Sequence, residues 1–216
     1  MKQRFDLLIF DWDGTLFDSI DWIVHCLQQA ARVCGYPVPD AALTCSVIGL
    51  SIDGAMAELF PEADPELASR LIEVYRSVYA QEVINETRLF PGVREMLGRL
   101  KQGGFRLAVA TGKSRQGIDQ ALAATGTAPL FDAVRCGEES ASKPDPQMLY
   151  EIMHELKTSS NRSLMIGDSL HDLRMAKNAG IEAVGVACGA NSREQLLSMT
   201  PLLCLQQTAE LLPLLV

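Results

Sequence analysis

Five short apolar runs, separated by helix-like segments, limit the folds that are open to this chain of 216 residues. Each run is continuously apolar, which is typical of parallel strands covered on both faces. The intervening segments repeat apolar residues at helical spacing and carry helix-start signals such as Ser114 and the Asp145-Pro146 pair. This alternation predicts βαβ units, and therefore an α/β fold with a doubly wound, mostly parallel sheet. The runs are LLIF at 7–10, FRLAVAT at 105–111, FDAVRC at 131–136, SLMIGD at 163–168 and EAVGVAC at 182–188.

The stretch from 19 to 88 departs from this alternation. It contains three or four helical patterns and no convincing strand. One stripe begins at Ile20 and Ile23, a second pattern follows Ser51, and a third follows Asp64. We therefore expect residues 19–88 to form an all-helical unit, here called the helical insert. Residues 1–18 and 89–216 would form the α/β core.

Reactive residues follow three of the five predicted strands. Ligands of open α/β sheets bind beyond the carboxyl ends of the strands, so these residues should meet at one edge. Carboxylates bind Mg²⁺ through oxygen, while a hydroxyl, a lysine and free backbone N–H groups bind phosphate. A buried carboxylate without a partner is costly, so acids that end a buried strand require such a partner or solvent. The residues are Asp11, Asp13, Thr111, Gly112, Asp168 and Asp172, with Lys143 in the loop before the fourth strand.

Composition narrows the choice of partners and location. Acids outnumber bases by 27 to 19, and the formal charge of -8 argues against nucleic acid or an anionic membrane as the main partner. The six cysteines form no CxxC pair, so we expect reduced, packed thiols. Asp11 interrupts the first apolar stretch too early for a signal peptide, and no apolar run approaches the ~18 residues of a spanning helix. We expect a cytoplasmic protein.

Four segments, DWDGTL, ATGKS, SKPDP and GDSLHD, resemble in this order the four motifs of the haloacid dehalogenase-like hydrolase superfamily. The helical insert resembles the cap of its phosphoglycolate phosphatase-like branch, as do VIGLSI at 47–52 and LFPGV at 89–93. The resemblance covers nearly the whole chain. It implies a Mg²⁺-dependent phosphatase that acts through an aspartyl phosphate on a small phosphomonoester, such as phosphoglycolate, a sugar phosphate or a nucleotide.

The resemblance also implies a role for each catalytic residue. Asp11 would be the nucleophile that takes the phosphoryl group. Asp13 would be the general acid for the leaving alcohol and then the base for the attacking water. Lys143 would balance the charges of Asp11 and the phosphate.

The remaining motif residues would bind phosphate and metal. Thr111 and the Gly112 N–H would bind the phosphoryl oxygens together with Lys143. The Mg²⁺ ligands implied by the resemblance are a side-chain oxygen of Asp11, the backbone carbonyl of Asp13, and Asp168, with Asp172 binding either directly or through a neighbouring group.

Asp13 separates this interpretation from others in the superfamily. Dehalogenases lack an acid two residues after the nucleophile, because a carbon-halogen bond leaves no oxygen to protonate. Phosphonate hydrolases resemble DWAGT at this position and use a cap lysine, whereas residues 3–100 here contain no lysine. A phosphosugar mutase of the same superfamily stays an alternative, since such mutases also have the second Asp.

A receiver-type signalling domain is the alternative from another class, since it also places aspartates, a threonine and a lysine at strand ends. Receivers need only about 120 residues and no cap, and Asp13 would help to expel the phosphate that a switch must retain. We assign no role to His25 or His171, and we expect Arg70 and Arg76 to be solvated. The sequence leaves the oligomeric state open.

Overall fold

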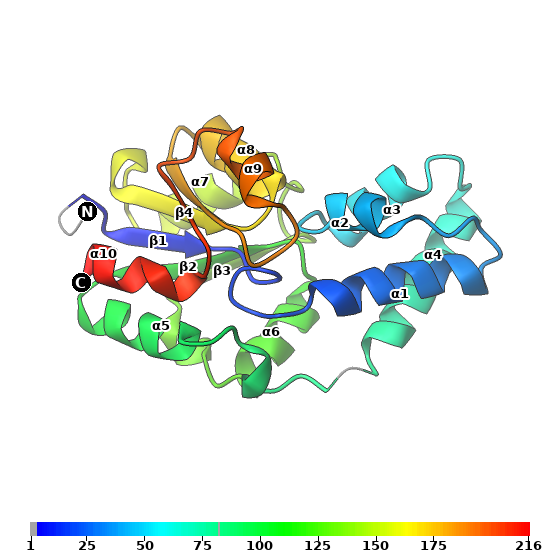
Figure 1. Cartoon of the computed structure of the whole chain (residues 1–216), viewed down its shortest axis with the longest axis horizontal. Helices are drawn as coiled ribbons and strands as arrows, with labels where there is room; N and C mark the ends of the chain where they lie inside the picture. The colour runs from blue at the N-terminus through cyan, green and yellow to red at the C-terminus, as the bar shows by residue number, and fades with distance from the viewer. Residues whose placement is uncertain (1–3, 82) are drawn as a thin grey trace.

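A single six-stranded parallel sheet organises the computed structural model, which describes residues 4–81 and 83–216 (Figure 1). The strand order is β3-β2-β1-β4-β5-β6, so the chain winds outward from β1 in one direction and then returns to continue in the other. The predicted doubly wound α/β fold is confirmed. The strands are β1 Leu7–Phe10, β2 Arg106–Thr111, β3 Ala133–Cys136, β4 Ser163–Gly167, β5 Glu182–Val186 and β6 Leu203–Leu205.

The sixth strand was not predicted. β6 has only three residues and pairs with β5 at the edge of the sheet, where Val184 lies opposite Leu203. A run this short cannot be told from an apolar loop by its pattern. The other five strands lie within the predicted runs.

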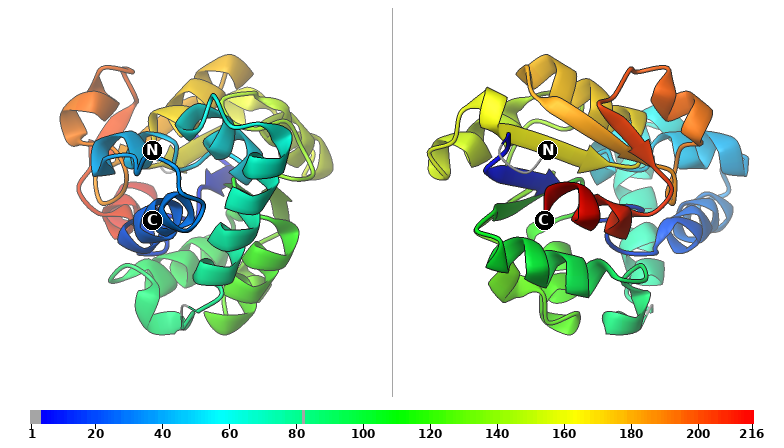
Figure 2. Two further views of the ribbon diagram at one scale, coloured as in Figure 1. Left: turned by 90° about the vertical axis from the view of Figure 1, so that its right-hand side faces the viewer. Right: turned by 60° about the vertical axis from the view of Figure 1, so that its left-hand side comes forward.

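Helices cover both faces of the sheet (Figure 2, right). Leu8 and Phe10 point to one face and Leu7 and Ile9 to the other, as the alternation of side chains along a strand requires. None of the helices in the described residues is long and apolar enough to cross a membrane. The first face is covered by α5 Val93–Gln102, α6 Arg115–Ala124 and α10 Leu212–Leu215, and the second by α7 Gln147–Glu155, α8 Leu170–Ala179 and α9 Arg193–Leu197.

The helical insert extends beyond the carboxyl ends of the strands (Figure 1). Helices α1, α3 and α4 share an apolar cluster, in which α1 packs against α4. The side chains of Asp40, Ser51 and Asp64 cap α2, α3 and α4 at their N-termini. The helices are α1 Ile20–Val33, α2 Ala41–Ser46, α3 Ile52–Leu59 and α4 Pro65–Tyr79, and residues 19–81 and 83–88 contain no strand. The boundaries 19 and 88 stay predictions.

The two segments that join the helical insert to the core lie side by side. The Asp18 N–H donates to the Arg88 carbonyl at 2.8 Å, and the Phe90 N–H donates to the Leu16 carbonyl at 3.0 Å. Phe17 and Leu89 form an antiparallel bridge between these bonds. The chain therefore leaves and re-enters the core at one point.

Candidate active site

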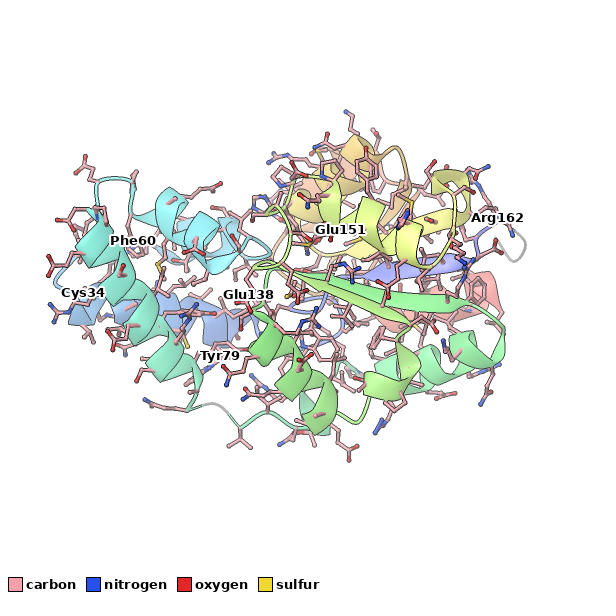
Figure 3. The ribbon with its side chains drawn as sticks, turned by 180° about the vertical axis from the view of Figure 1, so that it is seen from behind. Cys34, Phe60, Tyr79, Glu138, Glu151 and Arg162 are labelled. Carbon is pink, nitrogen blue, oxygen red and sulfur yellow. The ribbon has the colours of Figure 1, made fainter. Side chains whose placement is uncertain are left out.

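The carboxyl ends of β1 and β2 open into a cavity of about 1040 Å³ between the sheet and the helical insert. Asp11, Asp13, Thr111 and Gly112 line its floor, as predicted for strand ends that share one edge. Tyr79, at the end of α4, lines the cavity from the side of the helical insert (Figure 3).

Three buried carboxylates meet at this edge. One oxygen from each of Asp11, Asp168 and Asp172 lies within 4.8 Å of the other two, and all three residues are buried. Lys143 contributes a buried ammonium group, with Nζ 2.8 Å from Asp11 Oδ1 and 2.8 Å from Asp172 Oδ1. One ammonium group does not balance three carboxylates, and oxygen ligands suit a hard divalent cation. The residues present therefore fit a Mg²⁺ ion.

The electrostatics of this cluster favour added positive charge. Burial raises the pKa of Asp11 well above its ordinary value, against the lowering effect of Lys143. Burial, together with the charge of Asp172, raises the pKa of Asp168 to about 7. Burial by itself would lower the pKa of Lys143, but Asp11 and Asp172 raise it above its ordinary value, so this lysine is protonated.

Asp168 is held from both sides by short bonds. Thr15 Oγ1 donates to Asp168 Oδ1 at 2.7 Å, and the Ala190 N–H donates to Oδ2 at 2.7 Å. Gly14, with a φ of 77°, passes so close that a Cβ there would lie 2.3 Å from Asp168 Oδ2. The Gly and Thr of DWDGT are thus explained by the approach of the first loop to the end of β4.

Asp172 is fixed at the start of α8. Its Oδ2 accepts bonds from the Ser169 N–H at 3.1 Å and from Ser169 Oγ at 2.6 Å. The first of these bonds and the bond from the Asp172 N–H to Ser169 Oγ, at 3.2 Å, form a capping box. Its Oδ1 accepts from Lys143. This anchoring fixes the position of the lysine beside Asp11.

Asp13 has different partners from Asp11. Its Oδ1 accepts a bond from Ser19 Oγ at 2.5 Å and pairs with Lys113 Nζ at 3.0 Å. Lys113 also donates to the Tyr79 hydroxyl at 2.7 Å and lies 4.6 Å from the centre of its ring. Burial would lower the pKa of Lys113, but Asp13 and the bond to the Tyr79 hydroxyl raise it above its ordinary value.

The loop between α2 and α3 lies directly on the end of β2. A Cβ at Gly112 would be 2.1 Å from the Leu50 carbonyl oxygen, so only glycine fits there. The Ser51 N–H donates to Ser142 Oγ at 3.0 Å, and His171 Nε2 lies 2.7 Å from the Ser46 carbonyl oxygen. The helical insert is therefore docked against the core in this structure.

Several contacts were not foreseen from the sequence. Lys113 lies within ATGKS, two residues after a predicted strand end. That position could have indicated its contact with Asp13. No pattern marked Ser19 or Tyr79. Arg76 lines the exposed side of the cavity, whereas Arg70 does not line it.

The fold and site together define an α/β enzyme with an acidic centre at the carboxyl edge of its sheet. Residues 8–186 match the family described as haloacid dehalogenase-like hydrolase. The chain belongs to this family, as the four motifs indicated.

Relatives and solved structures agree with this membership. A phosphoglycolate phosphatase of Vibrio cholerae is 33% identical, with 90% of each chain covered. A probable phosphatase, IndB, of Dickeya dadantii is 35% identical over 90% of this chain and 86% of its own. The crystal structure of a predicted phosphoglycolate phosphatase from Haemophilus somnus has a TM-score of 0.87 at 26% identity, covering 97% of each chain.

Proposed function

We propose that this protein is a Mg²⁺-dependent phosphatase that hydrolyses a small phosphomonoester through an aspartyl phosphate on Asp11. The enzyme class, a phosphatase, follows from the family and from the names of its relatives. The metal, the covalent route and the residue roles are the proposal. The observation that carries it is that Asp11 and Asp13 line one cavity but have separate ionic partners.

Asp11 suits the role of nucleophile. Its backbone N–H donates to the Ile166 carbonyl at 2.9 Å, so the residue is fixed to the neighbouring strand. Lys143 lies 2.8 Å from its carboxylate and would offset the charge of an approaching phosphate. In the first step Asp11 attacks phosphorus, and the bond to the alcohol oxygen breaks.

Asp13 suits the role of acid and base. It stands two residues along the chain from Asp11 and lines the same cavity. In the first step it gives a proton to the leaving alcohol oxygen. In the second step it takes a proton from the water that attacks the aspartyl phosphate, which releases inorganic phosphate. Ser19 and Lys113 hold its carboxylate in place.

The remaining residues would bind the phosphoryl group and the ion. Thr111 and the Gly112 N–H would hold phosphoryl oxygens at the end of β2. Mg²⁺, held by Asp11, Asp168, the Asp13 carbonyl and either directly or indirectly Asp172, would neutralise charge on the phosphate. The substrate is a small phosphorylated metabolite. The expected cytoplasmic location, and the absence of nucleic-acid and membrane partners, stay predictions.

Two alternatives give different products. A phosphosugar mutase would convert one sugar phosphate into another with little phosphate release. A receiver-type domain would retain its phosphate, and the family found here does not favour it.

Steady release of phosphate from p-nitrophenyl phosphate in the presence of Mg²⁺ is the direct test. We expect activity to fall away with excess chelator and to return with Mg²⁺. Ca²⁺ should inhibit, because its looser coordination shell can engage both oxygens of Asp11.

Acid quenching should trap phosphate on the wild-type chain and none on Asp11→Asn. Hydrolysis that is undiminished in Ca²⁺ alone, or by Asp11→Asn, would contradict the proposal.

A further inference from the structure

The two sides of the cavity differ in chemistry. The core contributes the strand-end acids, Thr111, Lys113 and further polar side chains, whereas mainly apolar and aromatic side chains of the helical insert form the roof. The further polar residues are Ser114, Gln116, Gln120 and Glu138. We propose that the alcohol part of the substrate is apolar or aromatic and larger than the two-carbon glycolate of phosphoglycolate. This inference rests on the proposed function, since it concerns the leaving group of the same reaction.

Each helix that contributes to the roof does so with apolar or aromatic side chains, except that α4 also contributes the exposed Arg76. Ile23 and Leu27 come from α1, Ile52 from α3 and Tyr75 from α4, and the loop 47–50 adds further aliphatic surface. The Tyr75 and Tyr79 rings lie 5.7 Å apart and tilted by 31°, which gives the roof an aromatic corner. Such a surface is stabilised by covering it with an apolar group.

The cations that line the cavity are poorly suited to bind a substrate carboxylate. Among the described residues that line it, Lys113 and Arg76 are the cations. Lys113 is already engaged by Asp13 and by the hydroxyl and ring of Tyr79. Arg76 is exposed to solvent, where an ion pair contributes little, and Glu138 adds a negative charge to the lining. A glycolate carboxylate would therefore gain little from the lining cations and would lose its hydration against the apolar roof, which is costly.

The helical insert is docked against the core, so the size of the cavity does not come from a separation of the two. Bonds from Ser51 to Ser142 and from Lys113 to Tyr79 join the helical insert to the core in this structure. With the insert docked, the cavity measures about 1040 Å³. Sites for small molecules measure roughly 300–1,000 Å³, so a two-carbon acid would leave most of this space unfilled. Polar side chains available to a substrate hydroxyl, Ser114, Gln116, Gln120 and Glu138, belong to the core and not to the roof.

Three primary alkyl phosphates test the inference at matched chemistry. Ethyl phosphate, 2-phenylethyl phosphate and phosphoglycolate all carry the phosphate on a CH2 group, whose other substituent is a methyl, a benzyl or a carboxylate group. We expect kcat/KM to be highest for 2-phenylethyl phosphate, at least about tenfold above ethyl phosphate, since a single methylene in an apolar pocket can give that factor. Phosphoglycolate should be the poorest. If turnover is too slow to measure, the same order is expected for inhibition of p-nitrophenyl phosphate hydrolysis.

A charge placed in the roof should change this order. Ile52 is half-buried and lines the cavity, so Ile52→Lys adds a cation there without opening the insert's core. The ratio of kcat/KM for phosphoglycolate to that for 2-phenylethyl phosphate should rise at least tenfold. Leu43→Lys makes the same change at an exposed site of the helical insert outside the lining, and should leave the ratio unchanged.

The outcomes separate the two proposals. A wild-type preference for phosphoglycolate, or equal rates with ethyl and 2-phenylethyl phosphate, would overturn the inference while p-nitrophenyl phosphate hydrolysis still supports the phosphatase. A ratio that stays constant in Ile52→Lys would show that the roof does not face the leaving group. Absence of Mg²⁺-dependent hydrolysis of every ester would instead defeat the proposed function.

Discussion

The core and the helical insert line the same cavity, the core with charged and polar side chains and the insert mainly with apolar ones. At the strand ends of the core, buried carboxylates are paired with Lys143 and Lys113. The insert contributes an apolar cluster and a wall that faces these charges. Charge buried in a low-dielectric site acts strongly on a reacting phosphate, whereas apolar surface recognises shape without directing a reaction. Under the proposed function, the core would therefore carry out the chemistry and the insert would select the substrate.

The largest effect is expected in the core, at the nucleophile. Asp11→Asn should lower kcat by more than about 10³-fold, because the amide is a poor nucleophile and a poor ligand for a cation. The variant should stay folded, since its shape is almost unchanged. Kinetics with p-nitrophenyl phosphate and circular dichroism measure the two properties. Asp53→Asn, the same change at an exposed site of the insert, should keep full activity. A folded, fully active Asp11→Asn would place the chemistry elsewhere.

Asp13 should show the next largest effect, with a dependence on the leaving group. Asp13→Asn should slow hydrolysis of an alkyl phosphate by about 10²–10⁴-fold, the usual range for loss of a general acid or base. p-Nitrophenolate leaves well without a proton, so the first step should be slowed less with the aryl ester. Hydrolysis of the aspartyl phosphate still needs the base.

Rapid-quench kinetics of Asp13→Asn should therefore show a burst of p-nitrophenol of about one per active site, followed by a slow steady state. The burst requires phosphorylation to be faster than hydrolysis of the intermediate. Wild-type rates with both ester types would show that Asp13 is neither acid nor base.

A smaller effect is expected at Tyr79, where the helical insert contacts Lys113 of the core. Tyr79→Phe removes the hydroxyl that binds Lys113 at 2.7 Å but keeps the ring beneath the ammonium group. We expect kcat/KM to fall by less than about tenfold, because the ammonium group keeps Asp13 and the aromatic ring as partners. Tyr36→Phe, in the apolar cluster of the insert, is the control and should not change activity. A loss above a hundredfold would mean that the Tyr79 hydroxyl takes part in the chemistry.

The smallest effect is expected for charges of the core that lie outside the cavity. Arg115 Nε donates to Glu139 Oε1 at 2.7 Å, and this bond lowers the pKa of Glu139 to about 2 from its ordinary 4.5. The carboxylate therefore stabilises the fold above about pH 4.5, and this contribution is lost as the pH falls toward 2. Both side chains are more than a third exposed, so the pair contributes at most about 1 kcal/mol.

Urea unfolding at several pH values checks this prediction. Glu139→Gln should be slightly less stable than the wild type at pH 7, and the difference should shrink as the pH falls from 5 to 3. Glu62→Gln, an exposed acid of the insert, should show no such trend. A difference that grows in acid would reverse the assigned sign. Enzymatic activity should not change in either variant.

Local sequence patterns predicted most of the fold and the residues that form the floor of the site. Five strands, the helices of the insert and the convergence of Asp11, Thr111 and Asp168 at one edge follow from apolar periodicity and from the rule that parallel strands end together. The contacts of Lys113 with Asp13 and Tyr79 join segments that are remote in sequence. They depend on how the insert docks, and periodicity contains no information about docking. The same limit hid the apolar roof, because the residues that face the cavity look like ordinary core positions of a helix.

The paired bonds between 16–18 and 88–90 have a consequence for how such a chain can change over evolutionary time. A segment whose two ends are hydrogen-bonded neighbours can be lengthened, shortened or exchanged with little cost in loop closure, and without displacing the strands that it interrupts. Mutations that remodel residues 19–88 can then accumulate while β1 and the two aspartates that follow it stay in place. New substrates become accessible to an old reaction in this way.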